Sequence, residues 1–279
     1  MQYVMFTKHL QELSVPDAGR AIKELGFDGV ELTTRPGGHI LPEEVETTLP
    51  AAVEQLQALG LTVPALVVEI HNCRTPHADA VCRTAGALGA TLLRTSSWRY
   101  LGLGSARPQL ATARAECKEL EDLGREYGVR FCIHAHSGSY LSGQGALLAQ
   151  ILDGRDPRYV GVSLDMGHLT VEGGIHGWRI SMDLLRDYIG ILAVKSFGWF
   201  RTQDPQTGQH SWRATLVPLE EGLTQWTEVF KILDAIGWDG LVSLHSEYDN
   251  MTVPVRLAQT ARDFAHIRAS AAAATTGTQ

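Results

Sequence analysis

The chain has 279 residues, of which 44% are hydrophobic and 20% charged, and its formal net charge is −7. This composition is typical of a globular protein with one large core or two small ones. The acidic balance offers no basic surface for a phosphate backbone, so no nucleic-acid partner is expected. No apolar run approaches the roughly 20 residues of a membrane span, and the four cysteines form no Cys-x-x-Cys pair. We therefore expect a cytoplasmic protein without a membrane partner.

A short pattern recurs along the chain: a helical stretch, an apolar residue with a glycine, and then an apolar β-rich run. A first strand is predicted in YVMFT, residues 3–7, and a helix in PDAGRAIKEL, residues 16–25. A glycine in the left-handed conformation ends a helix, and a strand can begin directly after it. Strands are predicted at six such glycines: Gly26, Gly60, Gly89, Gly128, Gly190 and Gly237. YVGVSLD, residues 159–165, is predicted to be a further strand.

These elements amount to eight short strands, separated mostly by helical stretches at spacings of roughly 25 to 45 residues. Continuous apolar runs are typical of parallel strands that are buried on both faces. The pattern predicts a single (β/α)₈ barrel over residues 1–270, with a disordered tail at 271–279. The rival fold is an open doubly wound sheet. It usually has a glycine-rich turn after its first strand, which FTKHLQEL lacks.

The polar residues at the strand ends are predicted to form one pocket, because active sites of such barrels lie at the C-terminal ends of the strands. Residues two apart on a strand share a face, so His134 and His136 can both reach the pocket, as can His245 and Glu247. For either pair alone, it is equally plausible that one residue is packed in the core and the other is exposed at the surface, with no shared site. Together with Asp165, however, the set predicts an open divalent-metal site formed by His134, Asp165 and His245.

Two further segments are predicted to contact a substrate or a partner. Arg94 and Trp98 follow the fourth strand, where an arginine can bind a carboxylate or polyol oxygen and an indole can stack on a sugar. The alternative is an ordinary loop in which Trp98 covers the barrel. The longest loop, residues 196–218, is rich in aromatic residues and predicts a lid or a partner surface, and through it a homo-oligomer. Its aromatic residues include Trp199, Phe200 and Trp212.

Several segments together resemble the sugar phosphate isomerase/epimerase superfamily, which has the xylose isomerase-like TIM barrel. The segments are GFDGVELTTRPGGHI, HAHSG, SLDMGHLTVEGG, VKSFGW and GWDGLVSLHSEY. DMGHLT is also similar to the inosose dehydratase branch. The resemblance covers nearly the whole chain. It implies an enzyme with one divalent ion, manganese, zinc, cobalt or magnesium, held by an acid, an aspartate, a histidine and an acid on strands five to eight.

Carried over to this chain, the resemblance gives His134 in place of the first acid and Asp165 as a direct match. His245 occupies the last ligand position. Strand seven has Ala193 where the family has its ligand histidine, although it keeps the lysine of that motif as Lys195. One ligand is therefore absent, and the pattern is also compatible with a metal-free descendant.

The chemistry implied by the resemblance is removal of a proton α to a carbonyl of a sugar or keto-sugar, followed by isomerisation or epimerisation. Glu247 is the expected base, Lys195 is expected near the developing oxyanion, and His168 is a candidate acid. Substrate binding is expected from His39, Arg94, Trp98 and His136.

Other functions remain open at this stage. A lyase or dehydratase acting on a keto-sugar or keto-inositol begins with the same proton abstraction. A non-catalytic sugar-binding protein on a decayed barrel is the alternative of another class, suggested by Ala193 and Ser196. Repair of abasic DNA is disfavoured by the acidic charge balance.

Overall fold

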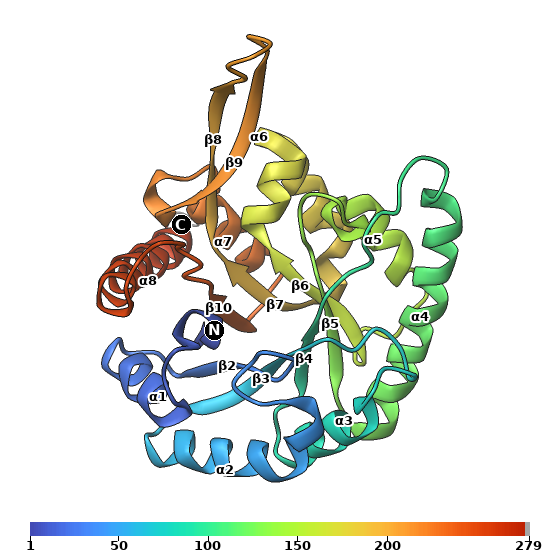
Figure 1. The fold of residues 1–279 in the computed structure, drawn as a ribbon, viewed down its shortest axis with the longest axis vertical. Helices are drawn as coiled ribbons and strands as arrows, with labels where there is room; N and C mark the ends of the chain where they lie inside the picture. The colour runs from blue at the N-terminus through green and yellow to red at the C-terminus, as the bar shows by residue number, and fades with distance from the viewer. Residues whose placement is uncertain (277–279) are drawn as a thin grey trace.

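The computed structural model describes residues 1–276, which contain eight parallel strands closed into a barrel (Figure 1). In chain order the barrel strands are β1 (Gln2–Phe6), β2 (Gly29–Thr33), β3 (Thr62–Val68), β4 (Leu92–Thr95), β5 (Arg130–His134), β6 (Val160–Asp165), β7 (Ile189–Val194) and β10 (Leu241–Leu244). Each pairs in parallel with the next, and β10 pairs with β1 to close the ring. The predicted (β/α)₈ barrel is confirmed, and the open sheet is excluded.

The α-helices surround the barrel, as Figure 1 shows. They are α1 (Val15–Glu24), α2 (Val45–Ala58), α3 (Ala78–Ala87), α4 (Ala106–Tyr127), α5 (Gly145–Leu152), α6 (Met166–Leu185), α7 (Trp226–Ala235) and α8 (Val253–Thr276). Helix α8 includes residues 271–276, so this part of the expected disordered tail is helical, while 277–279 lie outside the described residues. Within residues 1–276, none of the helices combines the length and the apolar character that crossing a membrane requires.

Most of the predicted glycine caps are confirmed by the backbone angles. Five of the six predicted glycines have a positive φ and come shortly before a strand. They are Gly26 (87°), Gly60 (72°), Gly89 (75°), Gly128 (67°) and Gly237 (67°). The prediction was wrong at Gly190, which lies inside β7. A Cβ on Gly190 would lie 2.5 Å from Cys132 Sγ, so this glycine provides space inside the barrel instead of ending a helix.

The barrel interior is packed with side chains from alternate positions on the strands. One buried apolar cluster joins Val4, Ala65, Cys132, Ile191 and Leu241, from β1, β3, β5, β7 and β10. Because side chains alternate along a strand, the residue two positions after Cys132 also points inward, at the C-terminal end of β5. The same alternation brings the inward residues of the other strands to this end of the barrel.

Residues 196–217 form an antiparallel β-hairpin and not the loop expected from the sequence. Its strands are β8 (Ser196–Gln203) and β9 (His210–Val217), and Figure 1 shows them projecting away from the barrel. The turn between them contains Gly208 with φ 69°, which favours a reversal of the chain. Its exposed aromatic side chains are Trp199 (40%), Phe200 (49%) and Trp212 (63%). The association of copies through this segment remains a prediction.

Candidate functional site

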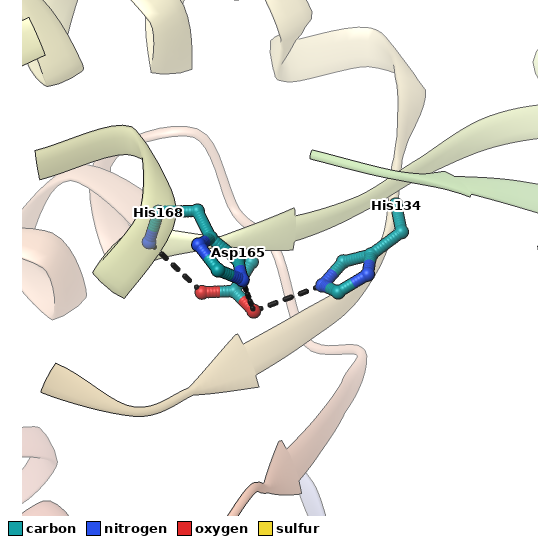
Figure 2. A group of neighbouring side chains, drawn as sticks. All are labelled: His134, Asp165 and His168. Carbon is teal, nitrogen blue, oxygen red and sulfur yellow. Dashed lines mark hydrogen bonds and ion pairs between the residues drawn. The ribbon is translucent and has the colours of Figure 1, made fainter. Parts of the chain in front are cut away.

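Three potential metal ligands meet where β5 and β6 end and α6 begins: His134, Asp165 and His168 (Figure 2). One ligand atom of each lies within 4.8 Å of the others. Asp165 Oδ2 lies 2.9 Å from His134 Nε2 and 3.8 Å from His168 Nε2. Asp165 also caps α6, since its Oδ1 accepts a hydrogen bond of 3.1 Å from the backbone N–H of His168. The cap therefore holds the first turn of the helix against the carboxylate.

The remaining predicted ligand, His245, approaches the same carboxylate from the end of β10. Its Nδ1 lies 4.0 Å from Asp165 Oδ2, and its Nε2 lies 3.2 Å from Glu31 Oε2. Because a carboxylate only accepts, Nε2 is assigned the proton, and Nδ1 keeps its lone pair toward Asp165. The structure thus gathers the three predicted ligands around one oxygen and adds His168, which was predicted only as a catalytic residue.

Three linked ion pairs lead from the cluster toward the mouth of the barrel. Lys195 Nζ lies 3.0 Å from Asp165 Oδ2 and 2.7 Å from Glu247 Oε2. The other oxygen of Glu247 lies 3.0 Å from Lys8 Nζ. The side chain of Lys195 is 3% exposed, that of Glu247 21% and that of Lys8 48%. Charges of opposite sign therefore alternate from the buried floor to the solvent.

Burial keeps the cluster histidines neutral. It lowers the pKa of His134 to about 3, although the hydrogen bond to Asp165 opposes this shift. It also lowers the pKa of His245, and it lowers the pKa of His168 well below its ordinary value. Neutral imidazole is the form that binds metal ions, so the three side chains have the charge state of metal ligands at neutral pH. In the metal-free protein His134 Nε2 carries the proton, because it donates to Asp165 Oδ2 at 2.9 Å.

The acidic and basic groups next to these histidines remain charged. Burial works against the charge of Lys195, but Asp165 and Glu247 outweigh it and raise the pKa of the ammonium group. Burial likewise opposes ionisation of the two carboxyl groups, but the positive charge of Lys195 helps to hold the pKa of each well below its usual range.

A buried polar network supports His245 from beneath. Glu31 Oε1 accepts a hydrogen bond of 2.6 Å from Arg94 Nε, and its Oε2 accepts one of 2.6 Å from Ser243 Oγ. The guanidinium of Arg94 lies 4.3 Å from the centre of the Phe6 ring. Burial opposes the charge of Glu31, but Arg94 and His245 outweigh it and lower its pKa. Glu31 therefore fixes the orientations of both Arg94 and His245.

A cavity of about 390 Å³ opens beside this cluster. Five residues predicted for the site line it: Arg94, His134, His136, Lys195 and Glu247. His136 Nδ1 lies 2.8 Å from the carbonyl oxygen of Ser137 and is assigned the proton, which leaves Nε2 as a free acceptor. The ring centroids of His136 and His168 are 3.9 Å apart. The arrangement offers carboxylate, ammonium and imidazole groups to one small ligand.

Two predicted substrate-binding residues do not line this cavity. His39 Nδ1 bonds Thr33 Oγ1 at 2.9 Å, and its Nε2 bonds the carbonyl oxygen of Leu10 at 3.3 Å, so both ring nitrogens are engaged in the wall of the barrel. Trp98 donates from Nε1 to Glu116 Oε2 on α4 at 2.5 Å and packs against the core. Trp98 is therefore held against α4 and the core, outside the residues that line the cavity.

Sequence reasoning missed several residues that line the cavity: Lys8, Ser97 and Tyr140. Lys8 lies in a short 3₁₀ helix, Thr7–Leu10, directly after β1. Lys8 could have been predicted from the sequence, because it is a charged residue next to a strand end, as are several of the predicted site residues. Tyr140 and Ser97 lie in longer loops, where strand periodicity gives no direction for a side chain.

Strand β7 carries no potential metal ligand at Ala193, the position where the resemblance led us to expect a histidine. Ala193 pairs in register with Asp165 on the neighbouring strand and is fully buried. The next inward residue on this side is Lys195, whose ammonium contacts Asp165. A further imidazole, that of His168, reaches the same carboxylate from α6, with its Nε2 3.8 Å from Asp165 Oδ2.

The donor set fits a divalent metal ion. His168 Nε2 and His245 Nδ1 are buried and have no hydrogen-bond partner among the described residues. Buried polar atoms without partners are rare and indicate a missing ligand. Imidazole nitrogens together with one carboxylate oxygen suit zinc, manganese or cobalt. Such an ion would share Asp165 Oδ2 with the ammonium of Lys195.

Solved structures of other proteins share this fold. The IolI protein, solved with a bound zinc atom, is 17% identical over 96% of this chain and 98% of its own, with a TM-score of 0.72. The probable 3-DHS dehydratase AsbF of Bacillus anthracis is 16% identical over 95% and 99%, with a TM-score of 0.69. The 3-keto-D-glucoside 4-epimerase YcjR of E. coli is 14% identical over 96% and 99%, with a TM-score of 0.67. At such identities the likeness shows the fold alone.

Sequence comparison gives the family more directly. No curated protein matches the chain. The family model described as the xylose isomerase-like TIM barrel matches residues 20–270, which include every barrel strand except β1. The chain therefore belongs to the xylose isomerase-like TIM barrel family.

Proposed function

We propose that the protein is a metal-dependent isomerase or epimerase of a sugar or keto-sugar. The observation that carries this proposal is the convergence of three neutral imidazoles on Asp165, beside a cavity that also presents Glu247 and Lys195. The zinc atom in IolI and the epimerase activity named for YcjR support it, because both proteins have this fold.

A divalent ion would be held by His134, Asp165, His168 and His245. When bound, a divalent ion supplies polarisation of the substrate carbonyl and charge for the oxyanion that develops. Manganese, zinc, cobalt and magnesium can all supply this chemistry, and the imidazole-rich set favours the first three.

Proton transfer is assigned to Glu247. Its carboxylate is ionised, lines the cavity and is held through both oxygens, by Lys195 at 2.7 Å and Lys8 at 3.0 Å. A carboxylate fixed in this way can take the proton α to the carbonyl without first reorienting. The ammonium of Lys195 stabilises negative charge on the neighbouring substrate oxygen. His136, whose Nε2 is an acceptor, binds a substrate hydroxyl, and Arg94 binds a more distant oxygen.

The test is exchange of the substrate α-proton with deuterated water, followed by NMR on a panel of keto-sugars and ketoinositols. Glu247→Gln keeps the shape of the side chain but removes the base, so exchange should fall about 10²- to 10⁴-fold while the metal content stays within about twofold. Glu69→Gln is the matched control: Glu69 lines the same cavity, and within residues 1–276 its carboxylate forms an ion pair with Arg35 alone, across 3.7 Å. Exchange by this control should change less than about threefold, as expected for a weak surface pair.

The same spectra separate the rival functions. Equal exchange by wild type and Glu247→Gln would remove Glu247 from the role of base. Loss of water from the substrate would identify a lyase or dehydratase. Bound substrate without exchange for any member of the panel would identify a non-catalytic binding protein.

A further inference from the structure

The charged groups in and under the cavity balance one another without any ion. The positive side chains are Lys8, Arg35, Arg94 and Lys195. The negative ones are Glu31, Glu69, Asp165 and Glu247, of which Glu31 bonds Arg94 and Asp165 bonds Lys195 from the floor. Four charges of each sign cancel, so the site on its own is electrically neutral.

A divalent ion changes this balance. Placed among His134, Asp165, His168 and His245, it leaves an excess of two positive charges in a largely buried region. Protonation of any neighbouring histidine would only enlarge the excess. An uncompensated charge away from water is unfavourable, and a neutral sugar leaves it uncompensated. An anionic ligand reduces the excess, by one unit for each carboxylate that it carries.

The end of β4 carries donors that are free to receive such an anion. Arg94 is bound to Glu31 through Nε and Nη2, at 2.6 and 3.4 Å, while its Nη1 has no hydrogen-bond partner among the described residues. Ser97, three residues later, is 5% exposed and also lines the cavity. Its Oγ is buried and has no partner in residues 1–276. A buried hydroxyl without a partner indicates a ligand that supplies the acceptor.

We propose that the substrate is a carboxylate-bearing sugar acid or keto acid, whose carboxylate binds Arg94 and Ser97 at the end of β4. This inference rests on the proposed function and names the substrate class for the same site. A guanidinium and a hydroxyl suit a carboxylate, which only accepts hydrogen bonds. A second consequence follows from the charge balance: the divalent ion and the anion strengthen each other's binding by the same factor.

The coupling is measured with Mn²⁺ and a matched pair of four-carbon probes, the sugar acid erythronate and the neutral polyol erythritol. Metal-free wild-type protein is titrated with Mn²⁺ in the presence of each probe, and free Mn²⁺ is counted by its EPR signal, so that binding to the probe itself is subtracted. We expect erythronate to tighten Mn²⁺ binding at least about tenfold, equivalent to about 1.4 kcal/mol. Erythritol should change it less than about twofold.

Two substitutions locate the effect. Ser97→Ala should weaken erythronate binding to the Mn²⁺-loaded protein about tenfold, as expected for a hydrogen bond to a charged group, and leave binding of Mn²⁺ alone unchanged. Ser211→Ala, an exposed hydroxyl on β9, is its control and should change neither. Lys195→Met removes one positive charge beside the ion, so it should tighten binding of Mn²⁺ alone and reduce the effect of erythronate. Lys231→Met removes a remote charge on α7 and is its control.

The outcomes separate this inference from the proposed function. Equal effects of erythronate and erythritol, or unchanged erythronate binding in Ser97→Ala, would overturn the anionic substrate. Tight Mn²⁺ binding without coupling to erythronate would also overturn it and would leave the metal-dependent isomerase intact. No Mn²⁺ binding under any condition would overturn both.

Discussion

Replacing Asp165 with asparagine should destabilise the metal-free protein, and much of this loss should disappear when Lys195 is also replaced with methionine. Asparagine keeps the size of the side chain and can still cap α6 through its oxygen, which in Asp165 accepts from the backbone N–H of His168 at 3.1 Å. The substitution therefore removes mainly the negative charge. The ammonium of Lys195 is left in a site where its side chain is 3% exposed.

The magnitude follows from the separation of the charges. Lys195 Nζ and Asp165 Oδ2 are 3.0 Å apart, and at an effective dielectric constant of about 20 two unit charges at this distance attract by about 5 to 6 kcal/mol. Desolvation of both groups offsets part of this attraction, and Lys195 keeps its second partner, Glu247, at 2.7 Å. We expect Asp165→Asn to lower the free energy of unfolding by about 2 to 4 kcal/mol, with a coupling energy to Lys195→Met of about 2 kcal/mol.

The assay is urea unfolding of wild type, both single variants and the double variant, at pH 7 with EDTA. The control cycle uses Lys118 and Asp122, an ion pair on α4 whose side chains are 47% and 54% exposed; its coupling energy should stay below about 0.5 kcal/mol. A coupling energy for Asp165 and Lys195 as small as that of the control would refute the reasoning.

The difference in free energy of unfolding between wild type and Asp165→Asn can also be measured as a function of pH. Because the folded-state pKa of Asp165 is lowered, its stabilisation is fully present above the unfolded pKa of about 3.9 and is lost as the pH falls through the folded pKa. The difference between wild type and Asp165→Asn should therefore be constant from about pH 5 to 8 and shrink only below about pH 4. If the difference in free energy of unfolding already declines between pH 8 and 6, the titrating group is not Asp165.

Two further predictions concern the cluster and the barrel interior. Because burial lowers the pKa of His134 to about 3 and also lowers those of His168 and His245, Mn²⁺ affinity measured by EPR should fall less than about threefold from pH 7.5 to 5.5. Imidazoles with the ordinary pKa of about 6.5 would each lose about tenfold, and that result would contradict the burial argument. Gly190→Ala places a Cβ 2.5 Å from Cys132 Sγ and should cost about 1 to 3 kcal/mol in urea unfolding. Cys132→Ala in the same chain should recover part of this loss, and strictly additive effects would show that the two residues do not meet.

The parts of the site that lie on strands could be predicted from the sequence, because a strand has only two faces. Once the barrel was predicted, His134, Asp165 and His245 were expected together because each lies at a strand end, and in the structure both histidines lie within 4.0 Å of one oxygen of Asp165. Lys195 and Glu247 also follow strand ends, and they form an ion pair beside this cluster. The barrel itself followed from repeated glycine caps, which are a local property of the chain.

The parts of the site outside strands could not be predicted in this way. His39 and Trp98 lie in loops, and their partners, Leu10 and Glu116, lie 29 and 18 residues away in the sequence. Such contacts depend on how neighbouring loops pack and leave no periodic signal. His168 joins the cluster because Asp165 caps α6, a contact that is visible only once the start of the helix is known.

The hairpin after β7 has a further meaning for how this barrel can diverge. Its first and last residues, Ser196 and Val217, are directly paired across the two strands, so the chain leaves and re-enters the barrel at nearly the same point, within the roughly 5 Å that separates paired residues. Because its two ends are adjacent, the hairpin can be lengthened, shortened or exchanged without altering the path of β7 or α7. Because the hairpin begins directly after Lys195, changes in it can alter the region next to the site while the path of the barrel strands stays the same.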